Sequence, residues 1–424
     1  MPTRTSFSPF RTEIAGIPVA ELAQRYGTPT YVYDSAQIAE RIDDLKAFDV
    51  VRYAQKACSN IAILDFCRRR GVLVDAVSYG EMRRAMAAGY TPAGNPPPII
   101  FTADIFDREA LDFVVEQGIH VNCGSPDMIA QLGQRAPGRE ITLRINPGFG
   151  HGHSQKTNTG GEQSKHGIWR EQLADCLYQA DHHGLSVTGL HMHIGSGTDL
   201  EHLAQVVGAM EEAAAELGRS LRSISVGGGL PIPYREGDDY VDLAAYYDLW
   251  NAARARLASA VGHELHLEIE PGRYLVAESG YLVTEIRAIK QMGKNTFYLV
   301  DAGFNNLARP ILYGAYHPMS IVSTRGSGER PLQDVVVGGP LCESGDIFTQ
   351  EEGGYVATRA LPAAEVGDLL VIEKAGAYGS VMGSNYNSKP LAPEVLIADG
   401  KSHLIRARQS FDDLIRGESI PQID

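Results

Sequence analysis

The sequence predicts an α/β protein with a (β/α)8 barrel of the TIM type and a second, mainly antiparallel β-domain. Short apolar runs recur along the chain, and the first five lie 21 to 25 residues apart, which is the length of one strand, one helix and their turns. Eight such units favour a closed barrel over an open doubly wound sheet, because no Gly-x-Gly-x-x-Gly turn follows the first run. The runs are centred near Tyr53, Ala76, Phe101, Asn122, Arg144, His191, Val226 and Ile269.

The segments between the runs are predicted to be amphipathic helices. One of them has six apolar residues on a single helical face, with Glu211, Glu212 and Glu216 elsewhere, as expected for a helix that packs one side against a barrel. The six apolar residues are Leu203, Val206, Val207, Met210, Ala214 and Leu217.

Two stretches depart from this pattern. Residues 147–167 are rich in Gly, His, Ser, Thr and Asn and bury little apolar surface, so a loop over the barrel mouth is predicted there. After Gly280, short β-rich runs separated by Gly or Pro predict the β-domain. We therefore expect the barrel over residues 35–280 and the β-domain over 281–424, to which residues 1–34 are assigned although their periodicity does not decide it.

Composition narrows the classes of partner. Lys and Arg number 38 against 52 Asp and Glu, a net charge of −14, so neither a nucleic acid nor an anionic membrane surface is expected as a partner. No run is long enough to span a membrane, and the first twelve residues lack the apolar core of a signal peptide, so a cytoplasmic location is expected. The five cysteines form no C-x-x-C pair, which favours reduced thiols and predicts no metal site.

Polar residues follow the predicted strands, where a barrel of this type builds its site. A solvated surface residue is the commoner explanation for Lys56 taken singly, but burial at the tip of its strand would favour the neutral amine that forms a Schiff base. His191 and His193 alternate as in a strand, so a metal pair is conceivable. No third acidic ligand lies nearby, and His193 before a Gly-Ser-Gly turn better suits a ring packed on a planar cofactor.

Two further segments suit an anionic, heteroaromatic cofactor. Glu270 can keep a ring nitrogen protonated, while the amide of Gly272 and the guanidinium of Arg273 can bind a phosphate. The triplet Gly227, Gly228 and Gly229 exposes successive amides that would complete an anion cradle with Ser196 and Arg273. Taken alone, the segment from Glu270 to Arg273 is more often an ordinary turn with a structural ion pair. The glycine triplet, taken alone, is a tight bend as often as it is an anion site.

Seven ordered motifs across nearly the whole chain resemble the fold-type III decarboxylases that use pyridoxal 5'-phosphate. They are YAQKACSN at 53–60, HMHIGSG at 191–197, GGGLPIPY at 227–234, EPGR at 270–273, RPILY at 309–313, CESGD at 342–346 and GAYG at 376–379. The resemblance implies that Lys56 carries the cofactor, that His193 stacks on its ring and that Glu270 faces the pyridine nitrogen. It also implies that Ser196, the glycine triplet, Gly272 and Arg273 hold the phosphate end. One departure is that Cys58 and Ser59 precede Asn60, where the family commonly has Lys-Ala-Asn.

The resemblance also implies roles for residues after position 300. Cys342 would donate a proton, and Tyr378 would contact both cofactor and substrate. Arg273, Arg309, Tyr313 and Glu343 would line the substrate pocket. In this family the segment matching 342–346 comes from the partner subunit, so a homodimer with a composite active site is expected.

The expected reaction is the decarboxylation of meso-2,6-diaminopimelate to L-lysine and carbon dioxide, the last step of bacterial lysine biosynthesis. Arg309 and Tyr313 supply a cation and a hydroxyl suited to the second carboxylate of this small-molecule amino acid. Decarboxylation of a basic D-amino acid, such as D-ornithine or D-lysine, is the alternative. An amino-acid racemase is disfavoured by Glu270, where related racemases have an arginine. A non-catalytic cofactor-binding protein is disfavoured by the β-domain, because such proteins are typically a lone barrel.

Overall fold

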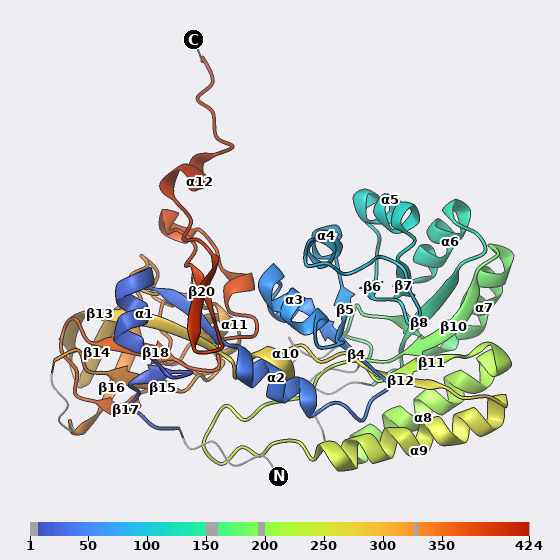
Figure 1. Ribbon diagram of the computed structural model, residues 1–424, viewed down its shortest axis with the longest axis horizontal. Coiled ribbons are helices and arrows are strands. Elements are labelled where there is room, and N and C mark those ends of the chain that lie inside the picture. Colours follow the sequence, from blue (N-terminus) through green and yellow to red (C-terminus); the bar gives the residue numbers. More distant parts are fainter. Residues whose placement is uncertain (1–6, 150–159, 194–199, 326–329, 424) are drawn as a thin grey trace. The chain divides into compact units, whose positions relative to one another are not determined.

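The computed structural model describes residues 7–149, 160–193, 200–325 and 330–423 (Figure 1). The chain divides into two compact units, each described here by itself. The barrel unit comprises residues 39–232 and 239–275, and the β-unit comprises residues 1–38, 233–238 and 276–424. The sequence did not predict that the short segment 233–238, which lies between two barrel elements, belongs to the β-unit.

Eight parallel strands form a closed barrel, because each pairs with its neighbour and the last pairs with the first. They are β4 (Val50–Ala54), β5 (Leu73–Ala76), β6 (Ile99–Ala103), β7 (His120–Cys123), β8 (Glu140–Asn146), β10 (Ser186–His191), β11 (Ser223–Ser225) and β12 (His266–Ile269). Seven of the eight predicted centres lie within these strands, and Val226 directly follows β11. The prediction of a (β/α)8 barrel is confirmed.

Helices follow these strands and cover the barrel (Figure 1). They are α3 (Ile61–Arg68), α4 (Tyr79–Ala87), α5 (Arg108–Gln117), α6 (Pro126–Arg135), α7 (Leu173–His182), α8 (Leu200–Leu217) and α9 (Leu243–Val261). Five begin at a side chain that accepts a backbone N–H of the first turn, which fixes where the helix starts. These capping residues are Asn60, Ser78, Asp107, Ser125 and Asp242. The six apolar residues predicted to share a face of α8 are all buried.

Shorter elements complete the barrel unit. They are η1 (Gln55–Ala57), β9 (Ile168–Trp169), η3 (Arg170–Gln172) and η4 (Gly218–Ser220), while α2 (Ser35–Asp43) and α10 (Arg273–Val276) cross its boundaries. Residues 150–159 of the loop predicted at 147–167 lie outside the described residues. A buried ion pair joins the strands that close the barrel, since Arg52 Nε on β4 donates to Glu268 Oε2 on β12 at 2.6 Å.

The β-unit contains a largely antiparallel sheet in the order β17-β16-β14-β13-β3-β19-β20, with β18 pairing β13 and β15. Within the described strands of the β-unit, the parallel pairs are β14 with β16 and β3 with β19. The strands are β1 (Glu13–Ile14), β2 (Ile17–Pro18), β3 (Thr30–Asp34), β13 (Gly280–Met292), β14 (Asn295–Val300), β15 (Met319–Val322), β16 (Leu332–Gly338), β17 (Arg359–Pro362), β18 (Leu369–Ile372), β19 (Glu394–Ala398) and β20 (Lys401–Arg406). The prediction of a second, mainly antiparallel domain is confirmed.

The N-terminal residues contribute to the core of the β-unit. Helix α1 (Val19–Tyr26) buries Val19 and Leu22 against Val32 of β3 and apolar residues of β13, β18 and β19. The other helical elements of this unit are α11 (Arg309–Tyr313), η5 (Ser380–Met382), η6 (Tyr386–Ser388) and α12 (Phe411–Ile415). Within the described ranges, every helix is too short or too polar to cross a lipid bilayer.

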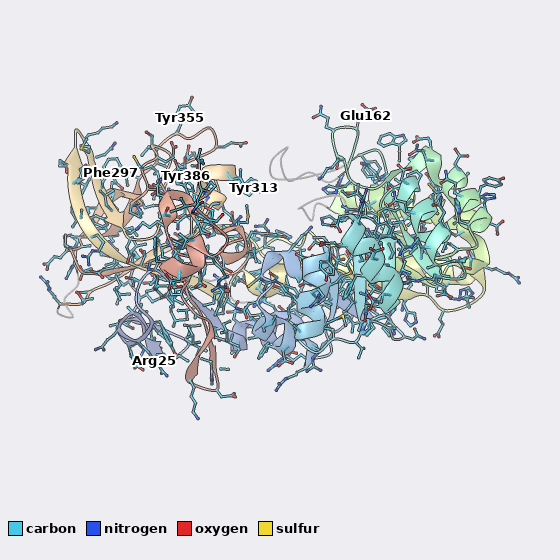
Figure 2. All side chains as sticks on the ribbon, turned by 90° about the horizontal axis from the view of Figure 1, so that it is seen from above. Arg25, Glu162, Phe297, Tyr313, Tyr355 and Tyr386 are labelled. Carbon is cyan, nitrogen blue, oxygen red and sulfur yellow. The ribbon has the colours of Figure 1, made fainter. Side chains whose placement is uncertain are left out.

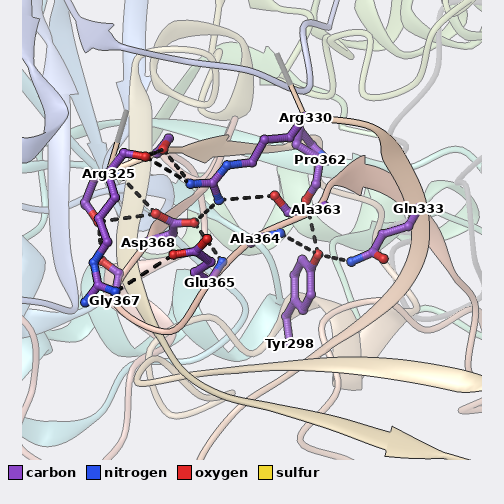
Figure 3. A network of polar contacts seen from close by, with 12 residues as sticks. Tyr298, Arg325, Arg330, Gln333, Pro362, Ala363, Ala364, Glu365, Gly367 and Asp368 are labelled. Carbon is purple, nitrogen blue, oxygen red and sulfur yellow. Dashed lines mark hydrogen bonds and ion pairs between the residues drawn. The ribbon is translucent and has the colours of Figure 1, made fainter. Parts of the chain in front are cut away.

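A polar network secures the turn before β18 (Figure 3). The fully buried Asp368 accepts backbone N–H bonds from Thr324 at 2.9 Å and from Glu365 at 2.8 Å, and it is paired with Arg330. Nearby, the hydroxyl of Tyr298 donates to the carbonyl of Pro362 at 3.1 Å. These bonds satisfy the buried carboxylate of Asp368 and the hydroxyl of Tyr298, and they help to hold the connection from β17 to β18.

Candidate active site

Lys56 lies in the turn that follows β4. It is the middle residue of η1, between the buried Gln55 and Ala57, but Lys56 itself is exposed. The burial of the amine expected from the sequence is therefore wrong for this structure. The strand does end in buried residues, and the 3-10 turn then rotates Lys56 away from them to the carboxyl end of the barrel.

Glu270 is buried just after β12 and has two hydrogen-bond donors. His191 Nε2 at the end of β10 lies 2.7 Å from Glu270 Oε2, and Ser225 Oγ at the end of β11 donates to Glu270 Oε1 at 2.9 Å. Burial alone would raise the pKa of the Glu270 carboxyl. The charge and hydrogen bond of His191, together with the bond from Ser225, lower that pKa to about 2. Glu270 is therefore an anion at neutral pH.

A second buried carboxyl, Asp75, lies at the end of β5. Burial raises its pKa and the negative charge of Glu270 adds to this, while a hydrogen bond with Thr102 and the charge of Lys56 oppose it, so that the pKa is about 7. Its Oδ1 atom has no hydrogen-bond partner among the described residues. The pKa values of the two carboxyls therefore move in opposite directions, because the partners of Glu270 outweigh its burial and those of Asp75 do not.

His193 packs on the glycine triplet. Its Nδ1 accepts the backbone N–H of Gly228 at 2.9 Å. Desolvation, with the positive charges of Lys56 and Arg144, holds the pKa of His193 well below its usual value, so the ring is neutral. Strand β10 ends at His191, and the two histidines contact different partners. The strand pattern expected to include both histidines therefore stops at His191.

The glycines of the triplet are needed for close packing. Gly227 has a φ of 68°, and a Cβ there would lie 2.6 Å from the carbonyl oxygen of Met192. A Cβ on Gly228 would lie 2.4 Å from the carbonyl oxygen of Glu270. The amide of Gly227 donates to Ser225 Oγ at 3.3 Å. Two amides of the triplet thus have acceptors within the protein, and Gly229, with a φ of 95°, completes the bend.

The Pro-Gly turn after Glu270 packs against the turn that carries Lys56. The amide of Ala54 donates to the carbonyl of Pro271 at 3.1 Å, and a Cβ on Gly272 would lie 3.1 Å from the carbonyl oxygen of Ala54. Arg273 begins α10 and is half-buried. Ser196 lies outside the described residues. Among the predicted cofactor residues, the structure therefore brings the Lys56 turn and the Gly272 turn together, and joins His193 to the glycine triplet and Glu270.

The remaining predicted residues belong to the β-unit. Arg309 is buried at the start of α11, and Tyr313 is half-buried at its end (Figure 2). Cys342 and Glu343 are exposed in the turn that follows Leu341, and the amide of Cys342 donates to Asn387 Oδ1 at 2.7 Å. A Cβ on Gly345 would lie 2.8 Å from Ile311 Cδ1, so this turn packs against α11.

Tyr378 lies in a tightly packed segment of the β-unit. Its φ of 57° is in the left-handed region, which a residue with a side chain adopts uncommonly. A Cβ on Gly376 would lie 1.9 Å from the carbonyl oxygen of Val276, so the backbones are in contact there. The glycines of the GAYG motif therefore allow the approach that fixes Tyr378.

Sequence reasoning missed three polar residues of the barrel end. Ser225 and the role of His191 become visible only from the register, which pairs His191 with Ser225 and Ser225 with Glu268, two residues before Glu270. Asp75 carried a signal, because it is an acid within the apolar run from Val72 to Ala76. A buried strand with one acid at its carboxyl end is a candidate site position.

Comparisons with known proteins agree with this architecture. The family described as "Pyridoxal-dependent decarboxylase, pyridoxal binding domain" matches residues 35–277. The diaminopimelate decarboxylase of Escherichia coli (strain K12) is 54% identical over 406 residues, covering 95% of this chain and 97% of that protein. The diaminopimelate decarboxylase of Streptomyces coelicolor is 54% identical over 404 residues, covering 95% and 92%.

A solved structure is similar over almost its full length. It is a crystal structure of diaminopimelate decarboxylase, with a TM-score of 0.93 and 54% identity, covering 97% of this chain and 99% of that one. The resemblance drawn from the seven motifs is thereby confirmed. The chain belongs to the pyridoxal-dependent decarboxylase family and, within it, to the diaminopimelate decarboxylases.

Proposed function

We propose that this protein is a carboxy-lyase that uses pyridoxal 5'-phosphate to convert meso-2,6-diaminopimelate into L-lysine and carbon dioxide. The observation that carries the proposal is Glu270, a buried carboxylate held as an anion by His191 and Ser225 at the carboxyl end of the barrel. Such a group favours a protonated ring nitrogen on a bound heteroaromatic cofactor, which decarboxylation requires. An arginine at this place, as in the related racemases, would disfavour that proton.

The residues of the barrel unit fit this cofactor. The glycine triplet lets the chain pack closely beside Glu270 and His193, since a Cβ on Gly227 or Gly228 would collide with backbone. We assign the aldehyde end of the cofactor to Lys56, the ring to His193, and the phosphate to Ser196, the glycine triplet, Gly272 and Arg273. When bound, the cofactor supplies an electron sink for the carbon that loses carbon dioxide.

The second carboxylate of the substrate is assigned to Arg309. Its guanidinium is buried and lies at the start of a helix that also carries Tyr313. A planar guanidinium matches a carboxylate with two parallel hydrogen bonds, which a distal amine does not offer. A diamino diacid therefore suits this residue better than D-ornithine or D-lysine, the alternative substrates. Glu343 and Tyr378 are assigned to the same pocket.

We assign the proton that replaces carbon dioxide to the thiol of Cys342. Cys342 and Glu343 belong to the β-unit, whereas Lys56 belongs to the barrel unit. Cys342 is exposed, and its backbone amide is fixed by Asn387. We propose a homodimer in which Cys342 and Glu343 of one subunit complete the site around Lys56 of the other. The proposed location of the dimer is the cytoplasm, where its free thiols stay reduced.

A substrate panel tests the proposed reaction. Carbon dioxide release is measured from meso-2,6-diaminopimelate, D-ornithine and D-lysine, with the cofactor bound as shown by a visible absorption band. We expect release from diaminopimelate, and loss of both the band and the activity in Lys56→Ala. Cofactor binding without release from diaminopimelate would refute the assignment, and preferential release from D-ornithine or D-lysine would favour the alternative.

Mixing two inactive variants tests the composite site. Lys56→Ala and Cys342→Ala are combined so that subunits exchange, which makes half of the dimers mixed, each with one intact site of two. Activity is then expected to recover to about a quarter of the wild-type value. Two separately prepared batches of Lys56→Ala, mixed in the same way, should stay at background. Exchange without recovery would place both residues in one chain's site.

A further inference from the structure

Arg309 is held by two aromatic side chains of the β-unit. Its Nη1 donates to His317 Nε2 at 2.8 Å and to the hydroxyl of Tyr234 at 3.2 Å. The guanidinium carbon also lies 4.9 Å from the centre of the Tyr234 ring, and the rings of Tyr234 and His317 meet edge to face with centroids 5.5 Å apart. The cation is thus fixed both in the plane of its hydrogen bonds and over an aromatic face.

The partners of His317 define its protonation. Arginine has only donors, so His317 Nε2 must accept the bond from Arg309 and carry no proton. His317 Nδ1 lies 3.0 Å from the backbone carbonyl oxygen of Glu373, which can only accept, so Nδ1 must carry the proton. His317 is almost fully buried. The observed arrangement therefore requires the neutral ring with its proton on Nδ1.

Tyr234 is itself anchored within the β-unit. It lies in the segment 233–238, whose first residue, Pro233, accepts a hydrogen bond from Lys374 through its carbonyl oxygen. Lys374 is buried and is paired with Glu278 at 2.9 Å. Neither contact of Arg309 therefore depends on a mobile surface side chain. One nitrogen of the planar guanidinium is fixed by residues that are themselves fixed, and this sets the plane of the whole group.

We propose that His317 is a positioning residue for substrate selection: as a neutral acceptor, it orients Arg309 to bind the substrate carboxylate that is not lost. The inference rests on the proposed function, and it extends that function to a residue outside the seven motifs. L-lysine keeps the carboxylate in question, whereas cadaverine lacks it. The contact should therefore affect diaminopimelate and L-lysine but not cadaverine.

The surroundings of His317 favour the neutral ring. Arg309 and Tyr234 face Nε2, and the carbonyl of Glu373 faces Nδ1. The carboxylate of Glu373 is occupied by Arg11, with Nε to Oε1 at 3.0 Å, and by Ser320 Oγ at 2.8 Å. Protonating His317 would remove the acceptor for Arg309 and put a second cation beside it. Both consequences oppose protonation of His317, so the neutral acceptor that orients Arg309 is retained.

Two neutral substitutions separate the contacts of His317. In His317→Gln the amide oxygen can reach the position of Nε2 and accept from Arg309. In His317→Asn the shorter side chain reaches only the position of Nδ1 and keeps the bond to Glu373. We expect His317→Asn to raise KM for diaminopimelate and the inhibition constant of L-lysine by roughly tenfold or more, with kcat changed less, while His317→Gln stays within about threefold of wild type.

The binding of cadaverine serves as an independent readout. The inhibition constant of cadaverine should be unchanged in both variants, and the cofactor band and thermal unfolding show whether each is folded. Equal KM values in all three proteins, or an equal loss of cadaverine and L-lysine binding, would overturn the inference. A wild-type enzyme inactive on diaminopimelate would instead overturn the proposed function.

Discussion

His191 Nε2 lies 2.7 Å from Glu270 Oε2, and both side chains are buried where β10 and β12 end. Burial of a carboxyl raises its pKa, so the low pKa of Glu270 depends on the partners that oppose burial. Each unit of pKa change corresponds to about 1.4 kcal/mol of differential stabilisation of the two protonation states. This contact therefore couples the charge of Glu270 to the stability of the fold.

Replacing His191 should flatten the acid dependence of stability. The pKa of Glu270 is lowered from 4.5 in its ordinary state to about 2 in the folded protein, so its contribution to stability is present above 4.5 and is lost as the pH falls toward 2. In His191→Gln, without cofactor, we expect lower stability at neutral pH and a smaller further loss in that window. Urea unfolding at several pH values measures this. Exposed His403→Gln is the matched control, and parallel curves for His191→Gln and wild type would contradict the prediction.

Replacing Asp75 should change the free energy of unfolding with the opposite dependence on pH. The pKa of Asp75 is raised from 3.8 to about 7 by burial and by the charge of Glu270. The stability that protonated Asp75 contributes is therefore fully present below pH 3.8 and is lost as the pH rises through 7. Asp75→Asn, without cofactor, should therefore gain stability over wild type as the pH rises from about 4 to 8, by about 1.4 kcal/mol per unit of raised pKa. The difference in unfolding free energy tests this. Asp248→Asn on the exposed side of α9 should show no such trend.

A methyl group on Gly228 should damage the cofactor site. The added Cβ would lie 2.4 Å from the carbonyl oxygen of Glu270, so the backbone must shift and the bond from Gly228 to His193 is lost. We expect the dissociation constant of pyridoxal 5'-phosphate to rise by roughly tenfold or more, the cost of about one hydrogen bond, with a lower melting temperature. Absorbance titration and thermal unfolding measure both.

The control for this substitution is Gly208→Ala in α8. Nothing lies within 4 Å of a Cβ at Gly208, and alanine in a helix interior is about 0.5–1 kcal/mol more stable than glycine. This variant should bind cofactor as wild type does and melt at the same or a higher temperature. If Gly228→Ala behaves in the same way, the close packing of the triplet has no part in cofactor binding.

The barrel was predictable because each strand is a short apolar run at a regular interval. Strand β11 is the instructive case, since it ends at Ser225, one residue before the predicted centre at Val226. Gly227, with its positive φ, bends the chain directly afterwards. In the β-unit, β3 has an equally apolar pattern, but its pairing with β13 and β19 depends on residues more than 200 positions away. Periodicity carries no information on such pairing.

The site was predictable only in part, because contacts between residues distant in the chain cannot be read from the sequence pattern. Motif residues such as Glu270 and Lys56 are recognisable from their neighbours in the chain. The charge state of Glu270 depends instead on His191 and Ser225, which the barrel register brings to it. The exposure of Lys56 depends on the 3-10 turn after β4, which an apolar run does not reveal. Contacts across strands decide the electrostatics of this site.

Removing Arg309 should separate substrate recognition from cofactor binding. Arg309 belongs to the β-unit, whereas the residues assigned to the cofactor ring and phosphate belong to the barrel unit. In Arg309→Ala the cofactor band should persist. The fall in kcat/KM for diaminopimelate should correspond to a loss of roughly 1.5–3 kcal/mol of transition-state stabilisation, which is the contribution of a charge-assisted hydrogen bond. Arg309→Lys keeps the charge but loses the planar fork, so it should recover only part of this loss. Steady-state carbon dioxide release measures all three proteins. If Arg309→Ala matches wild type, the second carboxylate is bound elsewhere, because a buried cation that contacts the substrate cannot be removed without cost.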